Sequence, residues 1–114
     1  MPAEIFRTET GPAARLSPGS PARTAASYDE IPYESHAIAD SHPDHIAAIA
    51  ALFGIESPDP ARCRVLELGC ARGDNVMAMA TTLPGASFVG VDGSARQIAD
   101  GERRRSGAGL DNVK

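Results

Sequence analysis

The chain has 114 residues, a formal net charge of -4 and a hydrophobic fraction of 42%. This length suits one small domain, and the mildly acidic balance disfavours general binding to nucleic acids or anionic membranes. No apolar run reaches the roughly 18 residues that span a membrane, and the N-terminus lacks the apolar core of a secretory signal. Cys63 and Cys70 follow no zinc or redox spacing, so we expect reduced thiols in a cytoplasmic protein.

The first 60 residues divide into two parts. Residues 1–27 are mostly Pro, Ala, Gly, Ser and Thr, with few large apolar side chains. Such a composition buries too little surface to offset the entropy of ordering, so we expect this segment to be disordered. Residues 28–60 are expected to form an irregular segment followed by a helix. Tyr28 and Tyr33 lie in the irregular part, where packing on the sheet edge is favoured over closing on a ligand.

The helix is predicted to begin at Pro43, which suits a first helical position, and to be capped by Gly54. The apolar residues that share one face at helical spacing are Ile46, Ile49, Ala50 and Phe53. Three histidines, His36, His42 and His45, precede or open this helix. They have no third ligand at a fixed spacing, so we expect surface side chains and no metal site.

From Cys63 onward, apolar runs and helical patterns alternate. The predicted elements are a strand over 63–68, a helix over 73–83, a strand over 86–92 and a helix over 94–105. Ser94 is the expected cap of the last helix and Gly107 its expected stop. This order predicts a Rossmann-like, doubly wound α/β fold with a parallel sheet, of which only the first βαβα portion is present.

Residues 110–114 look like the approach to a further strand. A doubly wound sheet usually has about five or more strands. We therefore expect residues 61–114 to be the N-terminal, truncated part of a larger cofactor-binding domain.

The turn after the first strand occupies the position where open parallel sheets bind nucleotides. Small residues at Gly69, Ala71 and Gly73 let the backbone turn tightly and approach a ligand. A dinucleotide enzyme needs G-x-G-x-x-G, and that spacing would place Asp74 at the third glycine, where an acid repels a pyrophosphate. Glu67 and Asp74 are instead suitable neighbours for a cationic, phosphate-free ligand such as S-adenosylmethionine.

Asp92 ends the second predicted strand. A carboxylate at this position can accept two hydrogen bonds from a ribose diol. Enzymes that use NAD and enzymes that use S-adenosylmethionine both place an acid here, so Asp92 indicates a nucleoside without choosing between them. An NAD(P)-dependent oxidoreductase and a non-catalytic truncated fragment therefore stay as alternatives.

The stretch "VLELGCARGDN", followed by "FVGVD", resembles motifs I and II of class I S-adenosylmethionine-dependent methyltransferases. The flanking sequence also resembles a bacterial subgroup in which the methyltransferase domain precedes a methyltransferase regulatory domain. The resemblance covers residues 28–114 and implies a Rossmann-like fold, S-adenosylmethionine as methyl donor and substrate residues further along the domain. The cofactor-binding residues that we expect are Glu67, Gly69, Cys70, Ala71, Gly73, Asn75, Asp92 and Gly93. Neither a catalytic residue nor a methyl acceptor is identified.

The sequence departs from the family pattern at Ala71 and Arg72. Alanine costs about 1 kcal/mol if its φ must be positive, so cofactor binding should be ordinary or weakened. We expect Arg72 to point into solvent in preference to meeting the carboxylate of a ligand. Cys70 is expected to be a small turn residue, because no histidine partner is available to activate it as a nucleophile.

Overall fold

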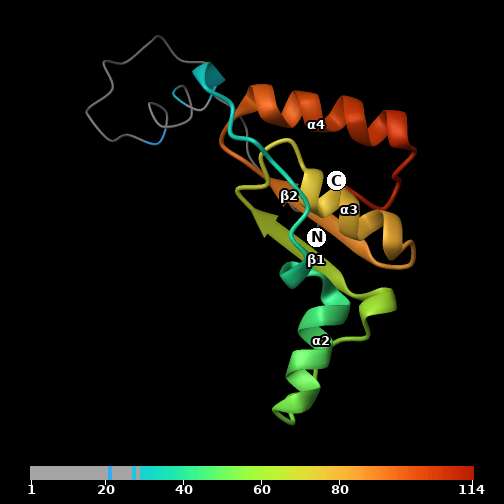
Figure 1. The fold of residues 1–114 in the computed structure, drawn as a ribbon. Helices are drawn as coiled ribbons and strands as arrows, with labels where there is room; N and C mark the ends of the chain where they lie inside the picture. Colours follow the sequence, from blue (N-terminus) through green and yellow to red (C-terminus); the bar gives the residue numbers. More distant parts are fainter. Residues whose placement is uncertain (1–20, 22–26, 28) are drawn as a thin grey trace, which may run out of the picture.

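The computed structural model describes residues 21, 27 and 29–114, coloured in Figure 1. The disorder expected for residues 1–27 falls almost wholly outside these residues, and so does Tyr28. The elements are η1 (Ala39–Ser41), α2 (Pro43–Leu52), η2 (Pro60–Arg62), β1 (Arg64–Leu68), α3 (Asp74–Thr82), β2 (Ser87–Val91) and α4 (Ala95–Ala108). No helix among the described residues is both long and apolar enough to cross a membrane.

The two strands form a parallel sheet that α3 connects, and Val65 pairs with Phe88 in its register. The strand–helix–strand–helix order is therefore confirmed. The end of the described chain lies along the free edge of β2, because Phe88 forms a parallel bridge with Val113. Phe88 N donates to Asn112 O over 2.8 Å, and Lys114 N donates to Phe88 O over 2.9 Å. The predicted approach to a further strand is thus present beside β2.

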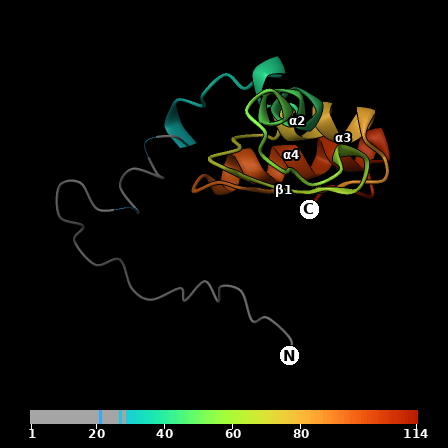
Figure 2. The ribbon, with the colours of Figure 1, turned by 90° about the horizontal axis from the view of Figure 1, so that it is seen from below.

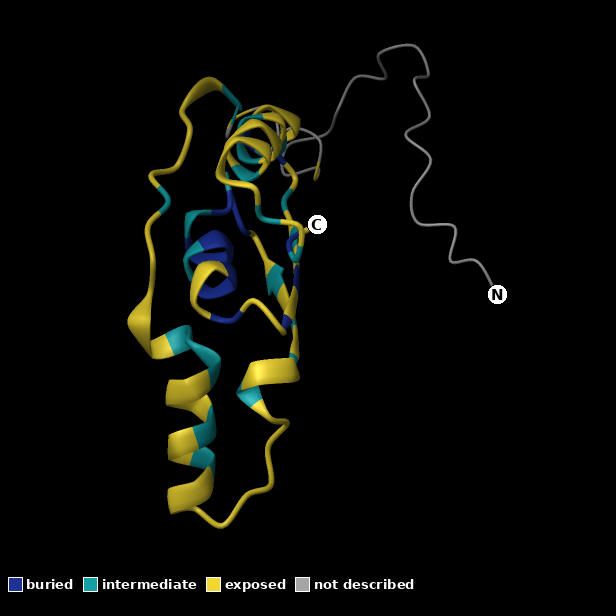
Figure 3. Ribbon diagram, turned by 90° about the vertical axis from the view of Figure 1, so that its right-hand side faces the viewer, coloured by how far each residue is buried: buried dark blue, intermediate teal, exposed yellow. Residues whose placement is uncertain are grey.

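The core lies on one face of this sheet. Figure 2 shows α2, α3 and α4 all on the same side of the strands, and the buried residues of Figure 3 gather in α3 and β2. The buried core residues are Val76, Met77, Met79, Ala80, Leu83, Ala86, Phe88 and Val113. Successive strand residues point to opposite faces, so the residues next to Phe88 lie on the other face. Its large apolar side chains are exposed: Leu66, Leu68, Val89 and Val91.

Helix α2 begins and ends as predicted, with Pro43 in its first turn and Gly54 at a φ of 67° just beyond it. The apolar residues that share one face of this helix are largely exposed, since Ile46, Ile49 and Phe53 are 53%, 43% and 76% exposed. The helix extends away from the sheet (Figure 3). Helical periodicity predicts which side of a helix is apolar, but not whether another element covers that side.

Helix α4 begins as predicted, because the Ser94 side chain accepts a hydrogen bond from Gln97 N over 3.1 Å. Its predicted end is wrong, since the helix continues through Gly107 to Ala108. Gly109, at a φ of 65°, ends it instead and donates to the Ser106 carbonyl over 3.2 Å. A glycine inside a helix costs about 1 kcal/mol relative to alanine, which a packed helix tolerates.

The C-terminal end of α3 is capped from a distant part of the chain. The Asn112 side-chain amide donates to the carbonyls of Ala80, Leu83 and Ala86 over 3.1–3.2 Å. The carbonyls of Ala80 and Leu83 lie at the end of α3, where backbone carbonyls lack intrahelical partners, and that of Ala86 lies in the turn before β2. The residues beside β2 therefore also close the end of α3.

Candidate functional site

The loop that joins β1 to α3 has left-handed backbone at Gly69, Ala71 and Gly73, with φ values of 72°, 51° and 82°. The loop is fastened to the end of β2, because Gly69 N and Cys70 N both donate to Val91 O, over 2.8 and 3.1 Å. Glycine adopts such angles freely, whereas alanine pays for them. The condition under which Ala71 costs energy is therefore met in this structure.

Asp92 joins the loops at the C-terminal ends of both strands. Its Oδ2 accepts a hydrogen bond from Ala71 N, and its Oδ1 accepts one from Ser94 N, each over 2.8 Å. A carboxylate offers about four acceptor positions, so both oxygens keep capacity for a ligand. Gly93, the next residue, is exposed. The ribose-binding role of Asp92 stays a prediction that this geometry allows.

Glu67 places one carboxylate oxygen in a closed network and leaves the other without a partner. Its Oε1 accepts a hydrogen bond from Asn75 Nδ2 over 2.9 Å. Its Oε2 is buried and has no hydrogen-bond partner among the described residues. Leaving a buried acceptor unpaired is costly, and a charged donor satisfies it best. An ammonium group, such as that of S-adenosylmethionine, fits this oxygen.

Both carboxylate oxygens of Asp74 already have partners within the protein, so Asp74 is not free to bind a cationic ligand. This corrects the expectation from the sequence. Its Oδ2 accepts from Arg72 Nε over 2.7 Å, and its Oδ1 accepts from Arg104 of α4. Burial acts to raise the pKa of Asp74, but the hydrogen bonds from the two arginines outweigh it and hold the pKa below its ordinary value. The carboxylate is therefore neutralised within the protein. A neutralised Asp74 does not repel a pyrophosphate, and Arg72 pairs with Asp74 instead of pointing only into solvent.

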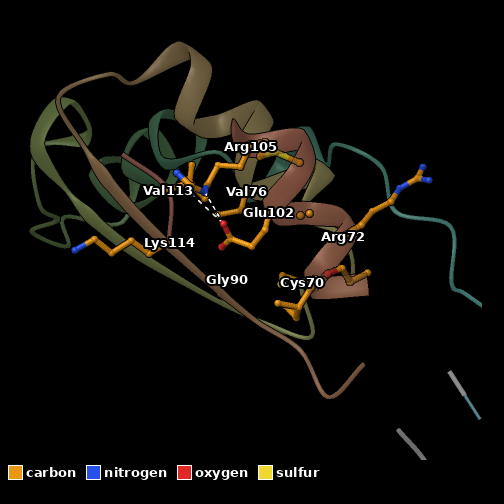
Figure 4. A pocket seen from close by; sticks show the side chains of 13 residues that line it. Cys70, Arg72, Val76, Gly90, Glu102, Arg105, Val113 and Lys114 are labelled. Carbon is orange, nitrogen blue, oxygen red and sulfur yellow. Dashed lines mark hydrogen bonds and ion pairs between the residues drawn. The ribbon is translucent and has the colours of Figure 1, made fainter. Parts of the chain in front are cut away.

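A small cavity of about 60 Å³ lies behind the loop, between α3, α4 and β2 (Figure 4). Cys70, Val76, Gly90 and Arg105 are among the residues that line it. Ligand pockets usually measure about 300–1,000 Å³, so this cavity is too small for a nucleoside. Burial, with contributions from the nearby Asp92 and Glu67, raises the pKa of Cys70 to about 11. Its thiol is therefore protonated at neutral pH. Because the thiolate is the reactive form, Cys70 fits the role of a turn residue and not that of a nucleophile.

A larger cavity of about 310 Å³ lies between residues 32–34 and α4, and Arg72 of the loop lines it. Tyr33 borders this cavity and is 67% exposed. The favoured prediction that Tyr33 packs on the edge of the sheet is therefore wrong. An exposed aromatic ring beside the loop is closer to the other interpretation, in which it closes over a ligand.

The eight predicted cofactor residues gather at the C-terminal ends of β1 and β2 and the first turn of α3. The sequence did not predict the contacts that the segment before α2 makes with Asn75 and with the start of α4. Asp29 accepts a hydrogen bond from Ser94 Oγ, and its carbonyl accepts one from Arg96 over 2.8 Å. Ile38 and Ser41 contact Asn75. The sequence of that segment could not predict these contacts, because its apolar residues follow no helical or strand periodicity.

His36 and His45 are exposed, as predicted for surface side chains, whereas His42 is half-buried. His42 caps α2, and its Nε2 lies 2.8 Å from Thr82 Oγ1. His45 lies 4.0 Å from Asp40. Within the described part of the chain, no three histidine, cysteine or acidic side chains are grouped so as to hold a metal ion.

The chain is similar to known methyltransferases in sequence and in fold. Residues 59–114 match the family described as a methyltransferase domain. An uncharacterized protein of Rickettsia prowazekii is 44% identical over 87 residues, which cover 76% of this chain and 16% of that protein. A tRNA (guanine-N(7)-)-methyltransferase of Chloroflexus aggregans is 39% identical over 74 residues, which cover 63% of this chain and 31% of that protein. The solved structure of PKMT2 from Rickettsia typhi in complex with AdoHcy superposes with a TM-score of 0.69 and 34% identity. The superposition covers 73% of this chain and 16% of the PKMT2 chain.

A parallel α/β unit with an acid at the end of each strand and a glycine-rich loop between them is a nucleoside-binding arrangement. Residues 59–114 belong to the methyltransferase-domain family, and the chain is similar to S-adenosylmethionine-dependent methyltransferases in sequence and structure. S-adenosylmethionine is the cofactor of this family, which favours it over the NAD(P) alternative. The chain covers 16% of the length of each of the two Rickettsia proteins compared above.

Proposed function

We propose that this chain is the cofactor-binding, N-terminal part of an S-adenosylmethionine-dependent methyltransferase. The observation that carries the proposal is the buried, unpartnered Oε2 of Glu67 beside a loop with three left-handed residues. This oxygen is suited to the ammonium group of the cofactor, and Asp92 keeps acceptor capacity for the ribose. The structure of PKMT2 with AdoHcy supports the same ligand class.

The residues of this chain would bind and orient the cofactor. When bound, S-adenosylmethionine supplies a methyl group on a sulfonium that is already a good leaving group. The protein then has to provide alignment and electrostatics for an in-line displacement. Glu67 and Asp92 would fix the two ends of the cofactor, and the backbone of residues 69–73 would pass between them. No residue of this chain is required as a catalytic base by this scheme.

Three further proposals concern the chain as a whole. We assign residues 28–60 to an N-terminal segment and residues 61–114 to the methyltransferase domain. The acceptor is proposed to be recognised by parts of a full domain other than this loop. A cytoplasmic location is supported by Cys63 and Cys70, which are both free thiols.

Titration calorimetry with S-adenosylhomocysteine tests the proposed function. We expect the chain to bind this ligand and not NAD, and we expect Asp92→Ala to weaken binding at least about tenfold, since it removes acceptors for a ribose diol. Asp111→Ala is the matched control, because Asp111 is an exposed acid outside the loop. Thermal melts of each variant separate lost binding from lost folding. Absence of binding by the wild-type chain, or equal binding by a folded Asp92→Ala variant, would contradict the proposal and favour the non-catalytic alternative.

A further inference from the structure

Asn75 lies where three parts of the chain meet. It is 6% exposed, in the first turn of α3. Its Nδ2 donates to Glu67 Oε1 over 2.9 Å and to Ser41 Oγ over 3.0 Å. Its Oδ1 accepts from Ile38 N over 2.7 Å. One buried amide therefore joins the end of β1 to the segment that precedes α2.

The orientation of this amide is determined by its partners. An ionised carboxylate can only accept hydrogen bonds, and a backbone N–H can only donate. The nitrogen of Asn75 must therefore face Glu67, and its oxygen must face Ile38. An asparagine satisfies both at once, whereas an aspartate would face Glu67 with a like charge and a leucine would satisfy neither.

The network ends at the atom that the proposed function uses. Asn75 occupies one oxygen of Glu67 and thereby fixes the plane of the carboxylate, whose other oxygen is buried without a partner among the described residues. A side chain held in this way loses less rotamer freedom when a ligand binds. Any shift of Glu67 on binding must also pass through Asn75 to the backbone of Ile38.

We propose that Asn75 is a positioning residue, which couples binding of the cofactor at Glu67 to docking of residues 38–41 on the site. The inference rests on the proposed function. Cofactor binding holds the segment down, and the docked segment in turn strengthens cofactor binding by the same factor, because coupling between two sites is reciprocal. The segment is thus part of the cofactor site although it contributes no residue to the family motifs.

The test combines calorimetry with S-adenosylhomocysteine and residue-resolved amide exchange by NMR on the full chain. In the wild-type protein we expect the ligand to slow exchange at the Ile38 amide severalfold. Asn75→Leu, which has a similar size and no polar atom, should bind about tenfold more weakly, and the ligand should no longer change exchange at Ile38. Ser41→Ala removes one partner of Asn75 and leaves the bond to Glu67, so its affinity should fall by a smaller factor, about two- to fivefold.

Thr82→Val is the matched control. It removes the contact between His42 Nε2 and Thr82 Oγ1, which fastens the same region without touching Glu67. We expect its affinity and the ligand-dependent protection of Ile38 to match the wild-type protein. A purely structural role for the segment would instead make Thr82→Val and Ser41→Ala weaken binding equally, which would overturn the coupling.

The remaining outcomes are also decisive. If the wild-type chain binds the ligand but Ile38 exchange does not change, or a folded Asn75→Leu variant binds as tightly as the wild type, the coupling is refuted while the proposed function stands. If Asn75→Leu does not fold, Ser41→Ala decides, and an unchanged affinity refutes the coupling. If the wild-type chain does not bind the ligand, the proposed function fails and the coupling fails with it.

Discussion

The two faces of the sheet carry similar apolar side chains, but those on one face are buried and those on the other are exposed. On one face, Phe88 is 1% exposed beneath α3. On the other, Leu68 is 75% exposed and Val91 43% exposed. The strands are the same, and only the presence of a covering helix differs. An apolar strand pattern therefore records a capacity for burial, and the energy is gained only where an element packs on it.

The proposed cofactor site lies between the packed and the open parts of the molecule. Its loop packs toward α4 and is fastened to β2, yet the segment that meets it, including Tyr33, stays largely exposed. Paired substitutions, one in the packed region and one in the open region, should therefore differ in their effect on stability or on ligand binding.

The largest expected contrast is between Phe88 and its neighbour Val89. Phe88→Ala removes a fully buried ring and should lower the free energy of unfolding by about 3–5 kcal/mol, enough to abolish a cooperative melt in a small domain. Val89→Ala, on the open face at 39% exposure, should cost less than about 1 kcal/mol. Urea unfolding followed by circular dichroism measures both. Equal losses would mean that the two faces do not differ.

The second contrast uses two glycines of α4. A Cβ at Gly101 would lie 2.8 Å from the carbonyl oxygen of Arg72, so Gly101→Ala must push the helix off the cofactor loop. We expect a loss of about 1–3 kcal/mol and weaker binding of S-adenosylhomocysteine. A Cβ at Gly107 meets nothing within 4 Å, so Gly107→Ala should gain about 0.5–1 kcal/mol from helix propensity. A stabilising Gly101→Ala would show that the close approach is not needed.

The third contrast concerns two acids. Asp74→Asn breaks the link between Arg72 and Arg104 and should cost about 1 kcal/mol, after allowance for solvent screening. Asp100 pairs only with Arg103 among the described residues, and the Arg103 side chain is 72% exposed, so Asp100→Asn should cost less than Asp74→Asn.

The acid dependence of Asp74 follows from the direction of its pKa. Because the folded pKa lies below the ordinary value of 3.8, the carboxylate stabilises the protein above pH 3.8. That contribution disappears as the pH falls through the folded pKa. The difference in melting temperature between wild type and Asp74→Asn should therefore shrink below pH 3.8, and a difference that persists unchanged in acid would contradict the ion-pair explanation.

The smallest expected effect is at Ala71. Its φ of 51° costs an alanine about 1 kcal/mol or more, but glycine loses more entropy on folding by a similar amount. Ala71→Gly should therefore stabilise the chain by a few tenths of a kcal/mol, seen as a rise of about 1–3 °C in melting temperature. Ala99→Gly, in the exposed part of α4, should destabilise by up to about 1 kcal/mol. A lower melting temperature for Ala71→Gly would count against strain at this position.

Local features of the fold were predictable because they depend on neighbours in the sequence. The alternation of strands and helices, the cap at Ser94 and the helix start at Pro43 all follow from short-range patterns. The end of α4 was predicted wrongly because both Gly107 and Gly109 could end the helix, and only the backbone angles show that Gly109 does. The exposure of the apolar face of α2 could not be predicted from its periodicity, since burial depends on elements distant in sequence.

The relative positions of the candidate site residues were predictable, whereas their polar partners were not. The motif spacing brings Glu67 and Asp92 to the ends of adjacent strands, as the family resemblance implies. It does not reveal that Arg104, from the next helix, neutralises Asp74, or that Asn75 faces Ile38 from the N-terminal segment. Long-range pairings of polar side chains leave no periodic trace in a single sequence, so an acid's partner cannot be deduced from its neighbours.

The cap that Asn112 places on α3 has a consequence for the order of assembly. The amide that closes the end of this helix comes from about 30 residues further along the chain. During synthesis, α3 and β2 can form their local bonds, but the last turn of α3 stays frayed until residues 110–114 have been made and have aligned beside β2. The strand edge and the helix end therefore lock together in a single late step.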